Sequence, residues 1–348
     1  MSSIEALTSC MKERLLGKTG LRVSEIGFGC WALGGNAYGP VRDKDSLEAL
    51  AAAWDFGVNF FDTADTYGEG HSEEILGKFL KGRSRDRLTL ATKCGWDFYT
   101  PSQKPASLLS QSSEKMNHAG HRKNFDNGYI RFACEQSLKR LGTDVIDLFQ
   151  LHNPSLELIQ KGDLVGVLEG LKKEGKIRFI GISVHTEAEA LAALEDARVQ
   201  TIQIILNLLD QRMAAKVLPE AAKKDVGVIV REALASGLLS GKYPPSHEFP
   251  KDDHRRRWFP EKREADWQKI QMIQKVLRPG ALSLPKAALE FTLAFETVST
   301  VIVGAKTRAQ VLENAKASLE PALSPEDIDR LRELYAQEEI FRKGLNPR

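Results

Sequence analysis

The sequence is poor in the features that mark secreted, metal-binding or membrane proteins. Four cysteines occur among 348 residues, and their wide spacing provides no metal-ligand motif: Cys10, Cys30, Cys94 and Cys134. Such scatter is typical of reduced thiols in a cytoplasmic protein. No apolar run approaches the ~20 residues that a membrane helix needs, and the N-terminal stretch lacks the apolar core of a signal peptide. We therefore expect a cytoplasmic protein without disulfides or membrane spans.

An excess of charge of one sign is also missing. Lysine plus arginine is 49 and aspartate plus glutamate is 47, a net charge of +2, so the composition predicts no nucleic-acid partner. One basic run, Arg255-Arg256-Arg257, lies in a segment rich in proline and charge, and we expect a solvated or cofactor-facing patch there. The length favours one large domain over residues 1–348, with a core that needs no disulfide staples.

Glycine-rich phosphate-binding loops are the next absence. Gly27-Phe28-Gly29 is followed by Cys30-Trp31-Ala32, so the Gly-x-Gly-x-x-Gly pattern of open dinucleotide-binding sheets is not present. Gly17-Lys18-Thr19 has Lys12 where a P-loop needs its leading glycine. An open doubly wound sheet is therefore the less favoured of the two parallel α/β folds.

The sequence does contain eight short apolar runs that alternate with amphipathic helices. Each run has the length and composition of a buried parallel strand. We place the strands near Glu25–Trp31, Asn59–Thr63, Leu88–Lys93, Asp147–His152, Phe179–Val184, Ile202–Asn207, Val226–Ala233 and Thr300–Ala305. This alternation predicts a (β/α)8 barrel over about residues 24–320, after an N-terminal β-hairpin (Leu16–Val23) and before an extra C-terminal helix that opens at Ser324.

Polar, ionisable residues close or follow three of these strands. Asp62 ends one strand and Tyr67 follows it, while Lys93 and His152 each end another. A parallel barrel builds its active site from the C-terminal ends of its strands. Each residue alone is more often structural: Asp62 as a helix cap, Tyr67 as a loop aromatic, and the other two as ordinary strand ends. Their conjunction favours a catalytic set.

These four residue types suit the reduction of a carbonyl group. A tyrosine hydroxyl has a pKa of about 10, and an ammonium group beside it lowers that value. A carboxylate holds the ammonium charged and aimed, and a neutral histidine donates to the substrate oxygen. Charge then develops on an oxygen already met by hydrogen-bond donors, so no metal is needed.

Several motifs, in order over most of the chain, resemble those of the aldo-keto reductase family. The GLLSGKY motif places the resemblance near the bacterial-type and channel-β-subunit-like branches. The motifs are Phe61-Asp62-Thr63-Ala64-Asp65-Thr66-Tyr67-Gly68, Ser137-Leu138-Lys139-Arg140-Leu141-Gly142-Thr143-Asp144, His152-Asn153-Pro154, Gly175-Lys176-Ile177-Arg178, Gly181-Ile182-Ser183, Gly237-Leu238-Leu239-Ser240-Gly241-Lys242-Tyr243 and Val303-Gly304-Ala305-Lys306.

The resemblance implies an NADP(H)-dependent oxidoreductase that interconverts a small-molecule carbonyl and an alcohol. It implies that Asp62, Tyr67, Lys93 and His152 are catalytic, with Tyr67 as the proton donor. It implies that Ser183 and Gln203 hold the nicotinamide carboxamide, with Trp31, Asp62 and Arg231 as further contacts at that end of the cofactor, and that Leu234, Ser236, Leu238 and Lys242 line the pyrophosphate path. It implies that Gly304, Lys306, Gln310, Glu313 and Asn314 hold the adenosine 2′-phosphate and adenine, and Arg308 is a further candidate cofactor contact. Two positions depart from many relatives. Val184 follows Ser183 where they carry asparagine, and Arg231 stands where they stack an aromatic ring, although a guanidinium can also stack.

The eighth strand and the helix after it also have features of a phosphate-binding site on physical grounds. Gly304 ends a strand, and Thr307 opens a helix flanked by Lys306 and Arg308. A helix N-terminus offers unpaired N–H groups and positive potential. A phosphate site and a plain basic surface are equally compatible with the residues alone, and the resemblance favours the adenosine 2′-phosphate.

Two long insertions follow strands on the predicted active-site face. They cover about residues 97–127 and 244–264. Loops of this length in a compact domain are usually functional or mobile. We expect the second to be a lid over cofactor and substrate, and the first remains open between a lid and a disordered segment.

Two other functions compete with the enzyme. Some barrels of this family are nucleotide-sensing regulatory subunits of ion channels, but those relatives tend to carry asparagine at the position of His152. A phosphate-handling barrel enzyme of another reaction class would leave the four strand-end residues unexplained.

Overall fold

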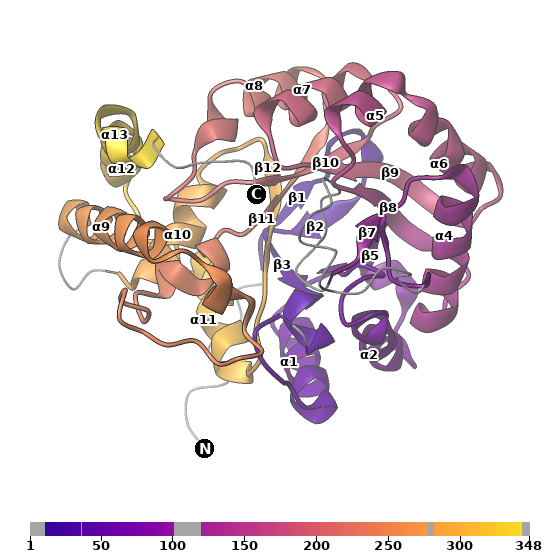
Figure 1. Ribbon diagram of the computed structural model, residues 1–348, viewed down its shortest axis with the longest axis horizontal. Helices are drawn as coiled ribbons and strands as arrows, with labels where there is room; N and C mark the ends of the chain where they lie inside the picture. The colour runs from indigo at the N-terminus through magenta and orange to yellow at the C-terminus, as the bar shows by residue number, and fades with distance from the viewer. Residues whose placement is uncertain (1–10, 36, 101–119, 278–281, 343–348) are drawn as a thin grey trace.

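A closed barrel of eight parallel strands forms the centre of the protein (Figure 1). The computed structural model describes residues 11–35, 37–100, 120–277 and 282–342. Around the barrel the strands follow their order in the chain, and the last pairs with the first. They are β3 (Ile26–Gly29), β4 (Phe60–Asp62), β5 (Thr89–Cys94), β8 (Ile146–His152), β9 (Ile177–Ser183), β10 (Thr201–Ile205), β11 (Gly227–Arg231) and β12 (Val298–Val303). All eight predicted strands are present, and the predicted (β/α)8 barrel is confirmed.

Helices surround the strands and cover their outer faces. They are α1 (Asp43–Asp55), α2 (His71–Leu80), α4 (Asn127–Leu141), α5 (Leu156–Lys161), α6 (Asp163–Lys173), α7 (Glu187–Glu195), α8 (Val217–Lys223), α9 (Pro260–Val276), α10 (Leu284–Leu293), α11 (Arg308–Leu319), α12 (Pro325–Gln337) and α13 (Glu339–Arg342). Thr186 caps α7 and Ser324 caps α12, each in a capping box. The extra C-terminal helix is therefore confirmed as α12. None of the helices within the described ranges is long and apolar enough to cross a membrane.

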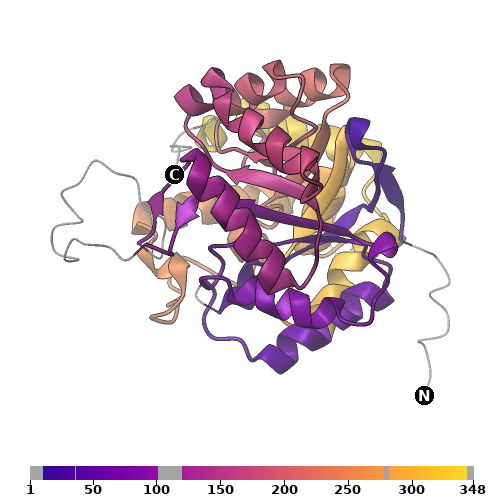
Figure 2. The same cartoon turned by 90° about the vertical axis from the view of Figure 1, so that its right-hand side faces the viewer.

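The N-terminal hairpin closes one end of the barrel. Its strands β1 (Glu13–Leu15) and β2 (Arg22–Ser24) pair antiparallel and lie at the end opposite the small sheet of β6 (Trp96–Asp97) and β7 (Arg122–Lys123) (Figure 2). Leu16 is fully buried against Phe60, Leu148 and Ile229 inside the barrel. This apolar plug and the C-terminal ends of the strands therefore lie at opposite ends of the barrel.

The interior of the barrel changes from apolar to polar along its axis. The plugged end holds the cluster of Leu16, Phe60 and their neighbours. Toward the C-terminal ends of the strands the buried interior side chains become polar, including Asp62, Lys93, Gln150 and Gln203. Buried polar groups need hydrogen-bond partners, so this layer forms one connected network.

The two insertions differ in how much of them the structure describes. Most of the first one, residues 101–119, lies outside the described ranges, and its ends pair as β6 (Trp96–Asp97) and β7 (Arg122–Lys123). The second is described throughout. Residues 244–259, which we term the strap, run from the β11 unit across to the loop after β3, and residues 260–264 form the first turns of α9.

Candidate active site

The four predicted strand-end residues meet at the C-terminal end of the barrel. Lys93 Nζ lies 2.6 Å from Asp62 Oδ1 and 3.4 Å from Tyr67 Oη. The Tyr67 and His152 rings are edge to face, with their centroids 5.8 Å apart. Asp62 and Lys93 have no more than 1% of their surface exposed. The chain thus brings together all four side chains that the pattern predicted.

A tight turn after β4 positions Tyr67. The Tyr67 N–H donates to the Ala64 carbonyl at 3.1 Å, and Gly68 follows with φ of +61°. The backbone of Gly34 packs directly on this turn, so that a Cβ on Gly34 would lie 2.6 Å from the Gly68 nitrogen. Glycine is therefore required at both positions. The Trp31 ring lies 6.1 Å from the Tyr67 ring and forms one wall of the site.

Lys93 uses all three of its ammonium protons. They go to Asp62 Oδ1, to the Thr63 carbonyl at 2.7 Å and to Tyr67 Oη. Burial lowers the pKa of Lys93, but attraction to Asp62 and Tyr67 outweighs it, and the net pKa lies above its usual value. Lys93 therefore carries its charge at neutral pH.

The pKa of Tyr67 is raised above 10.0 by burial, which exceeds the lowering effect of Lys93. Lys93 lowers the pKa of Tyr67 in the predicted direction, but burial has the larger effect on that pKa. The cause is the desolvation of the phenolate in this buried position, together with the nearby charge of Asp62. Tyr67 is therefore fully protonated at neutral pH.

His152 is held in its neutral form. Burial lowers its pKa well below 6.5, and the positive charges of Lys93, Arg231 and Lys123 lower it further. Its Nδ1 is buried and has no hydrogen-bond partner within the described part of the chain. The ring of Trp96, from the β6–β7 sheet, lies edge to face at 6.4 Å.

Two glutamines hold the second oxygen of Asp62. Gln150 Nε2 donates to Oδ2 at 3.1 Å and Gln203 Nε2 at 2.9 Å. Sequence reasoning placed Gln203 beside a cofactor amide and missed Gln150. The signal was present, because Gln150 lies two residues before His152 on the same strand and therefore points to the same side. Gln203 Oε1 is buried and without a partner among the described residues.

The predicted nicotinamide contacts lie on neighbouring strand ends. Ser183 Oγ donates to Asn153 Oδ1 at 3.1 Å, next to His152. Arg231 donates to the Val184 carbonyl at 3.0 Å and forms an ion pair with Glu232 at 2.9 Å. Both groups are therefore within the same cluster of strand ends as the four central residues.

A strained turn follows β11 at the predicted pyrophosphate path. Glu232, Ala235 and Ser236 have φ between 47° and 57°, a conformation rare for residues other than glycine. Such strain concentrates at functional sites. Ser236 Oγ is buried without a partner in the described ranges. Leu234 is half-buried, Leu238 is buried and Lys242 is exposed.

The predicted phosphate-binding residues surround the start of α11. Lys306 Nζ donates to the Tyr38 carbonyl at 2.6 Å, and Arg308 pairs with Asp55 at 3.4 Å. The Gln310 side chain accepts from the Lys306 N–H at 2.7 Å, so the first turn is already partly capped. Gly304 and Glu313 are exposed, whereas Asn314 is buried.

The strap connects this region to Trp31. The His254 N–H donates to the Ala37 carbonyl at 2.9 Å, and the His254 ring lies 4.9 Å from the Trp31 ring. Arg255 is buried, ion-paired with Asp253 at 2.6 Å. The expectation of a solvated patch is therefore wrong for Arg255, because stacking on aromatic rings and the Asp253 carboxylate bury its charge, whereas the cofactor-facing alternative stays a prediction. Arg256 and Arg257 are exposed.

This fold and this cluster of residues are matched in known proteins. A model of the aldo/keto reductase family matches residues 25–336. The chain belongs to the aldo/keto reductase family.

Individual relatives are similar in sequence to this chain over most of its length. Aldo-keto reductase YhdN of Bacillus subtilis (strain 168) is 35% identical to this aldo/keto reductase over 70% of the chain and 69% of its own length. D-threo-aldose 1-dehydrogenase from Pseudomonas sp is 32% identical over 86% and 91%. The solved holo form of aldo-keto reductase AKR11C1 from Bacillus halodurans has a TM-score of 0.76 at 30% identity, over 93% of this chain and 96% of that one.

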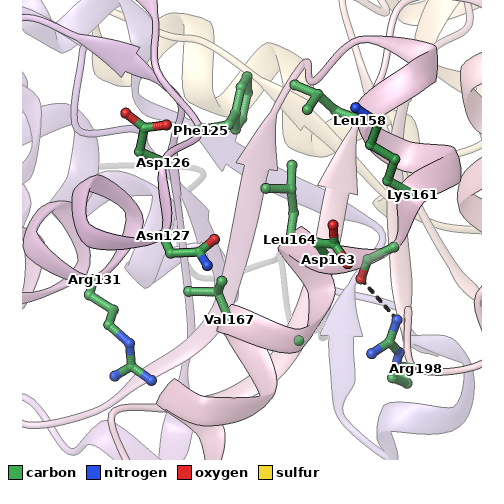
Figure 3. Close-up of a pocket in the computed structure, with 12 residues that line it drawn as sticks. Phe125, Asp126, Asn127, Arg131, Leu158, Lys161, Asp163, Leu164, Val167 and Arg198 are labelled. Carbon is green, nitrogen blue, oxygen red and sulfur yellow. Dashed lines mark hydrogen bonds between the residues drawn. The ribbon is translucent and has the colours of Figure 1, made fainter.

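A groove on the outer surface of this aldo/keto reductase lies apart from the four central residues. It encloses about 940 Å³ between α4 and α5–α6, and Arg198 at its edge donates to the Gly162 carbonyl at 3.0 Å (Figure 3). None of the four central residues lines it. Among the described residues, no group of three or more potential metal ligands comes together either.

The environment of His152 makes a testable prediction. We expect its imidazole signals in NMR to stay those of the neutral ring through the range where a free histidine, with a pKa of ~6.5, takes up a proton. The unfolded chain binds that proton and the folded chain does not, so stability should fall as pH drops below ~6.5. His152→Gln assigns the signals and should remove this part of the pH dependence. Protonation of His152 near that value would contradict the prediction.

Proposed function

We propose that this protein is an NADP(H)-dependent oxidoreductase that interconverts a small-molecule carbonyl and an alcohol. The observation that carries the proposal is the buried Lys93, which joins the Asp62 carboxylate to the Tyr67 hydroxyl beside a neutral His152. A proton donor backed by a fixed positive charge, next to a neutral N–H donor, is what carbonyl reduction requires.

Each of these residues has a distinct task in the proposed reaction. A bound nicotinamide supplies or accepts the hydride. Tyr67 gives its proton to the substrate oxygen, and its raised pKa keeps it protonated before reaction. Lys93 stabilises the phenolate as the proton leaves, and Asp62 keeps Lys93 charged and in place. Neutral His152 donates an N–H to the same oxygen and orients the carbonyl.

The cofactor assignment is supported by unsatisfied buried groups. Gln203 Oε1 and Ser236 Oγ have no partner among the residues that the structure describes, so the first can accept from a carboxamide N–H and the second can donate to a phosphate oxygen. The first turn of α11 presents positive potential beside Lys306 and Arg308. The residues that would hold the group are Trp31, Asp62, Ser183, Gln203, Arg231, Leu234, Ser236, Leu238, Lys242, Gly304, Lys306, Arg308, Gln310, Glu313 and Asn314.

Both nicotinamide cofactors appear in the names of relatives. One from Escherichia coli (strain K12) is named NADH-specific methylglyoxal reductase, and one from Schizosaccharomyces pombe carries NADP(+) in its name. The two basic residues at α11 favour NADPH for this chain. The channel-subunit relatives tend to carry asparagine at the position of His152, so the histidine favours an enzyme over a nucleotide-sensing subunit.

A direct assay separates these possibilities. Purified protein is mixed with NADPH and an aromatic aldehyde, and the loss of nicotinamide absorbance is followed. Steady turnover is the expected result. Tight NADPH binding without turnover of any aldehyde or ketone tried would contradict the enzyme and support the sensor.

Replacing Tyr67 tests the proton donor. We expect Tyr67→Phe to lower reductase activity by roughly 10²–10⁴-fold, the usual contribution of general acid catalysis. NADPH affinity should stay within a few-fold, because the hydroxyl faces the substrate oxygen in the proposed reaction. Tyr335→Phe, on α12 outside the site, is the control. Retention of more than about a tenth of the activity would mean that another group donates the proton.

Replacing Lys93 tests the charge behind that donor. Lys93→Met keeps an apolar stem but leaves Asp62 buried without its partner, so unfolding in urea should show a loss of about 3–5 kcal/mol. Residual activity should have its Tyr67 ionisation moved to higher pH. Lys269→Met removes another buried lysine, paired with Asp266 at 3.3 Å outside the site, and should cost stability without moving the pH profile. An unchanged profile in Lys93→Met would make Lys93 purely structural.

Replacing the two basic residues at α11 tests the cofactor preference. A charge-assisted hydrogen bond to a phosphate is worth roughly 1.5–3 kcal/mol, so the loss of one of these two side chains should weaken NADPH by about ten- to a hundred-fold, and the double change Lys306→Ala with Arg308→Ala should erase most of the preference for NADPH. NADH lacks the phosphate and should bind almost unchanged. Fluorescence titration of both nucleotides measures this, with Lys316→Ala in the last turn of α11 as the control. Undiminished discrimination would move the phosphate site elsewhere, with Arg255–Arg257 as the next candidates.

A further inference from the structure

The network around Asp62 extends one residue beyond the four central side chains. Gln150 on β8 is completely buried and donates to Asp62 Oδ2 at 3.1 Å. Its carbonyl Oε1 lies 3.3 Å from Gln203 Nε2, which also donates to Asp62 Oδ2 at 2.9 Å. Two linked amides from different strands therefore converge on the carboxylate oxygen that does not touch Lys93.

The neighbouring strand leaves room for this arrangement. Gly181 on β9 is in register with Gln150, and a Cβ built on Gly181 would lie 2.9 Å from Gln150 Cγ. That separation is shorter than real Cβ contacts show. The glycine thus leaves room beside β9 for the Gln150 side chain, whose amide reaches Asp62 on β4.

The side-chain amides of Gln150 and Gln203 determine how strongly the Asp62 carboxylate attracts the Lys93 ammonium. Hydrogen bonds to a carboxylate spread and hold its negative charge. Without the Gln150 donor, more of that charge would act on Lys93, whose contact with Asp62 is already 0.8 Å shorter than its contact with Tyr67 (2.6 against 3.4 Å). Asp62 also raises the pKa of Tyr67. A less satisfied Asp62 would therefore make Tyr67 a weaker acid.

We propose that Gln150 is a positioning residue for the proton donor: its amide fixes Asp62 Oδ2 so that Lys93 remains between Asp62 and Tyr67. The inference deepens the proposed function and rests on it. Gln203 holds the same oxygen through its N–H while its own Oε1 has no described partner. It thereby joins the proposed cofactor pocket to the same carboxylate.

The test is Gln150→Leu, which keeps the volume and removes the amide. We expect kcat for aldehyde reduction to fall about tenfold, the order of a lost hydrogen bond to a charged group, while KM and NADPH affinity stay within a few-fold. The alkaline limb of the kcat profile should move to higher pH, because Tyr67 must be protonated in this direction. Gln211→Leu, at a buried glutamine that donates to the Leu331 carbonyl, is the matched control and should leave the profile unmoved.

Gln150→Glu provides a pH-dependent rescue. Its protonated carboxyl donates to Asp62 as the amide does, whereas its ionised form repels Asp62. Its kcat should exceed that of Gln150→Leu at acidic pH and drop below it at alkaline pH. If both variants show the wild-type pH profile, with or without a loss of stability, Gln150 is only structural and the inference is overturned.

A second readout does not depend on turnover. The tyrosinate absorbance of each protein is titrated against the same protein carrying Tyr67→Phe, so that the difference reports Tyr67 alone. Gln150→Leu should raise the pKa of Tyr67. If the wild type fails to turn over, the proposed function fails, and this titration still decides whether Gln150 acts on Tyr67. An unmoved Tyr67 titration would overturn the inference.

Discussion

The ion pair between Lys93 and Asp62 is the interaction on which the rest of the site depends. Both side chains are buried, and taking each charge out of water costs several kcal/mol unless its remaining donors or acceptors are satisfied. Here they are: Thr63 and Tyr67 take the other Lys93 protons, and two glutamines take the second Asp62 oxygen. Loss of one member leaves another buried group unsatisfied, so the network is stable only when it is complete.

The barrel supplies what such a network requires. Each strand contributes one or two inward side chains at the same depth, so groups far apart in sequence, such as Asp62 and Gln203, meet without long side chains or loops. The apolar plug formed by Leu16 and its neighbours closes the other end. The polar layer lies toward the C-terminal ends of the strands, where ring contacts bring the strap to Trp31 and the β6–β7 sheet to His152.

Much of the fold and the centre of the site could be predicted because local patterns determine them. The eight apolar runs, the capping boxes at Thr186 and Ser324, and the ionisable strand ends are all short-range signals. The burial of Arg255 was missed because it depends on aromatic rings from distant segments that a local basic run does not reveal. The net pKa shift of Tyr67 was missed because desolvation depends on packing from several elements, whereas the Lys93 charge was visible from its strand position.

The raised pKa of Tyr67 is consistent with a general acid rather than opposed to it. Only interactions that strengthen in the transition state accelerate a reaction. In the resting site the phenol is neutral and Lys93 lies closer to Asp62 than to Tyr67, so the ammonium contributes little there. In the proposed reaction, charge appears on Tyr67 Oη as the proton leaves, and the same ammonium then gains a second anionic partner. The cations around His152 have a different effect: they disfavour a charged imidazolium, so that in the proposed reaction His152 would remain a neutral donor.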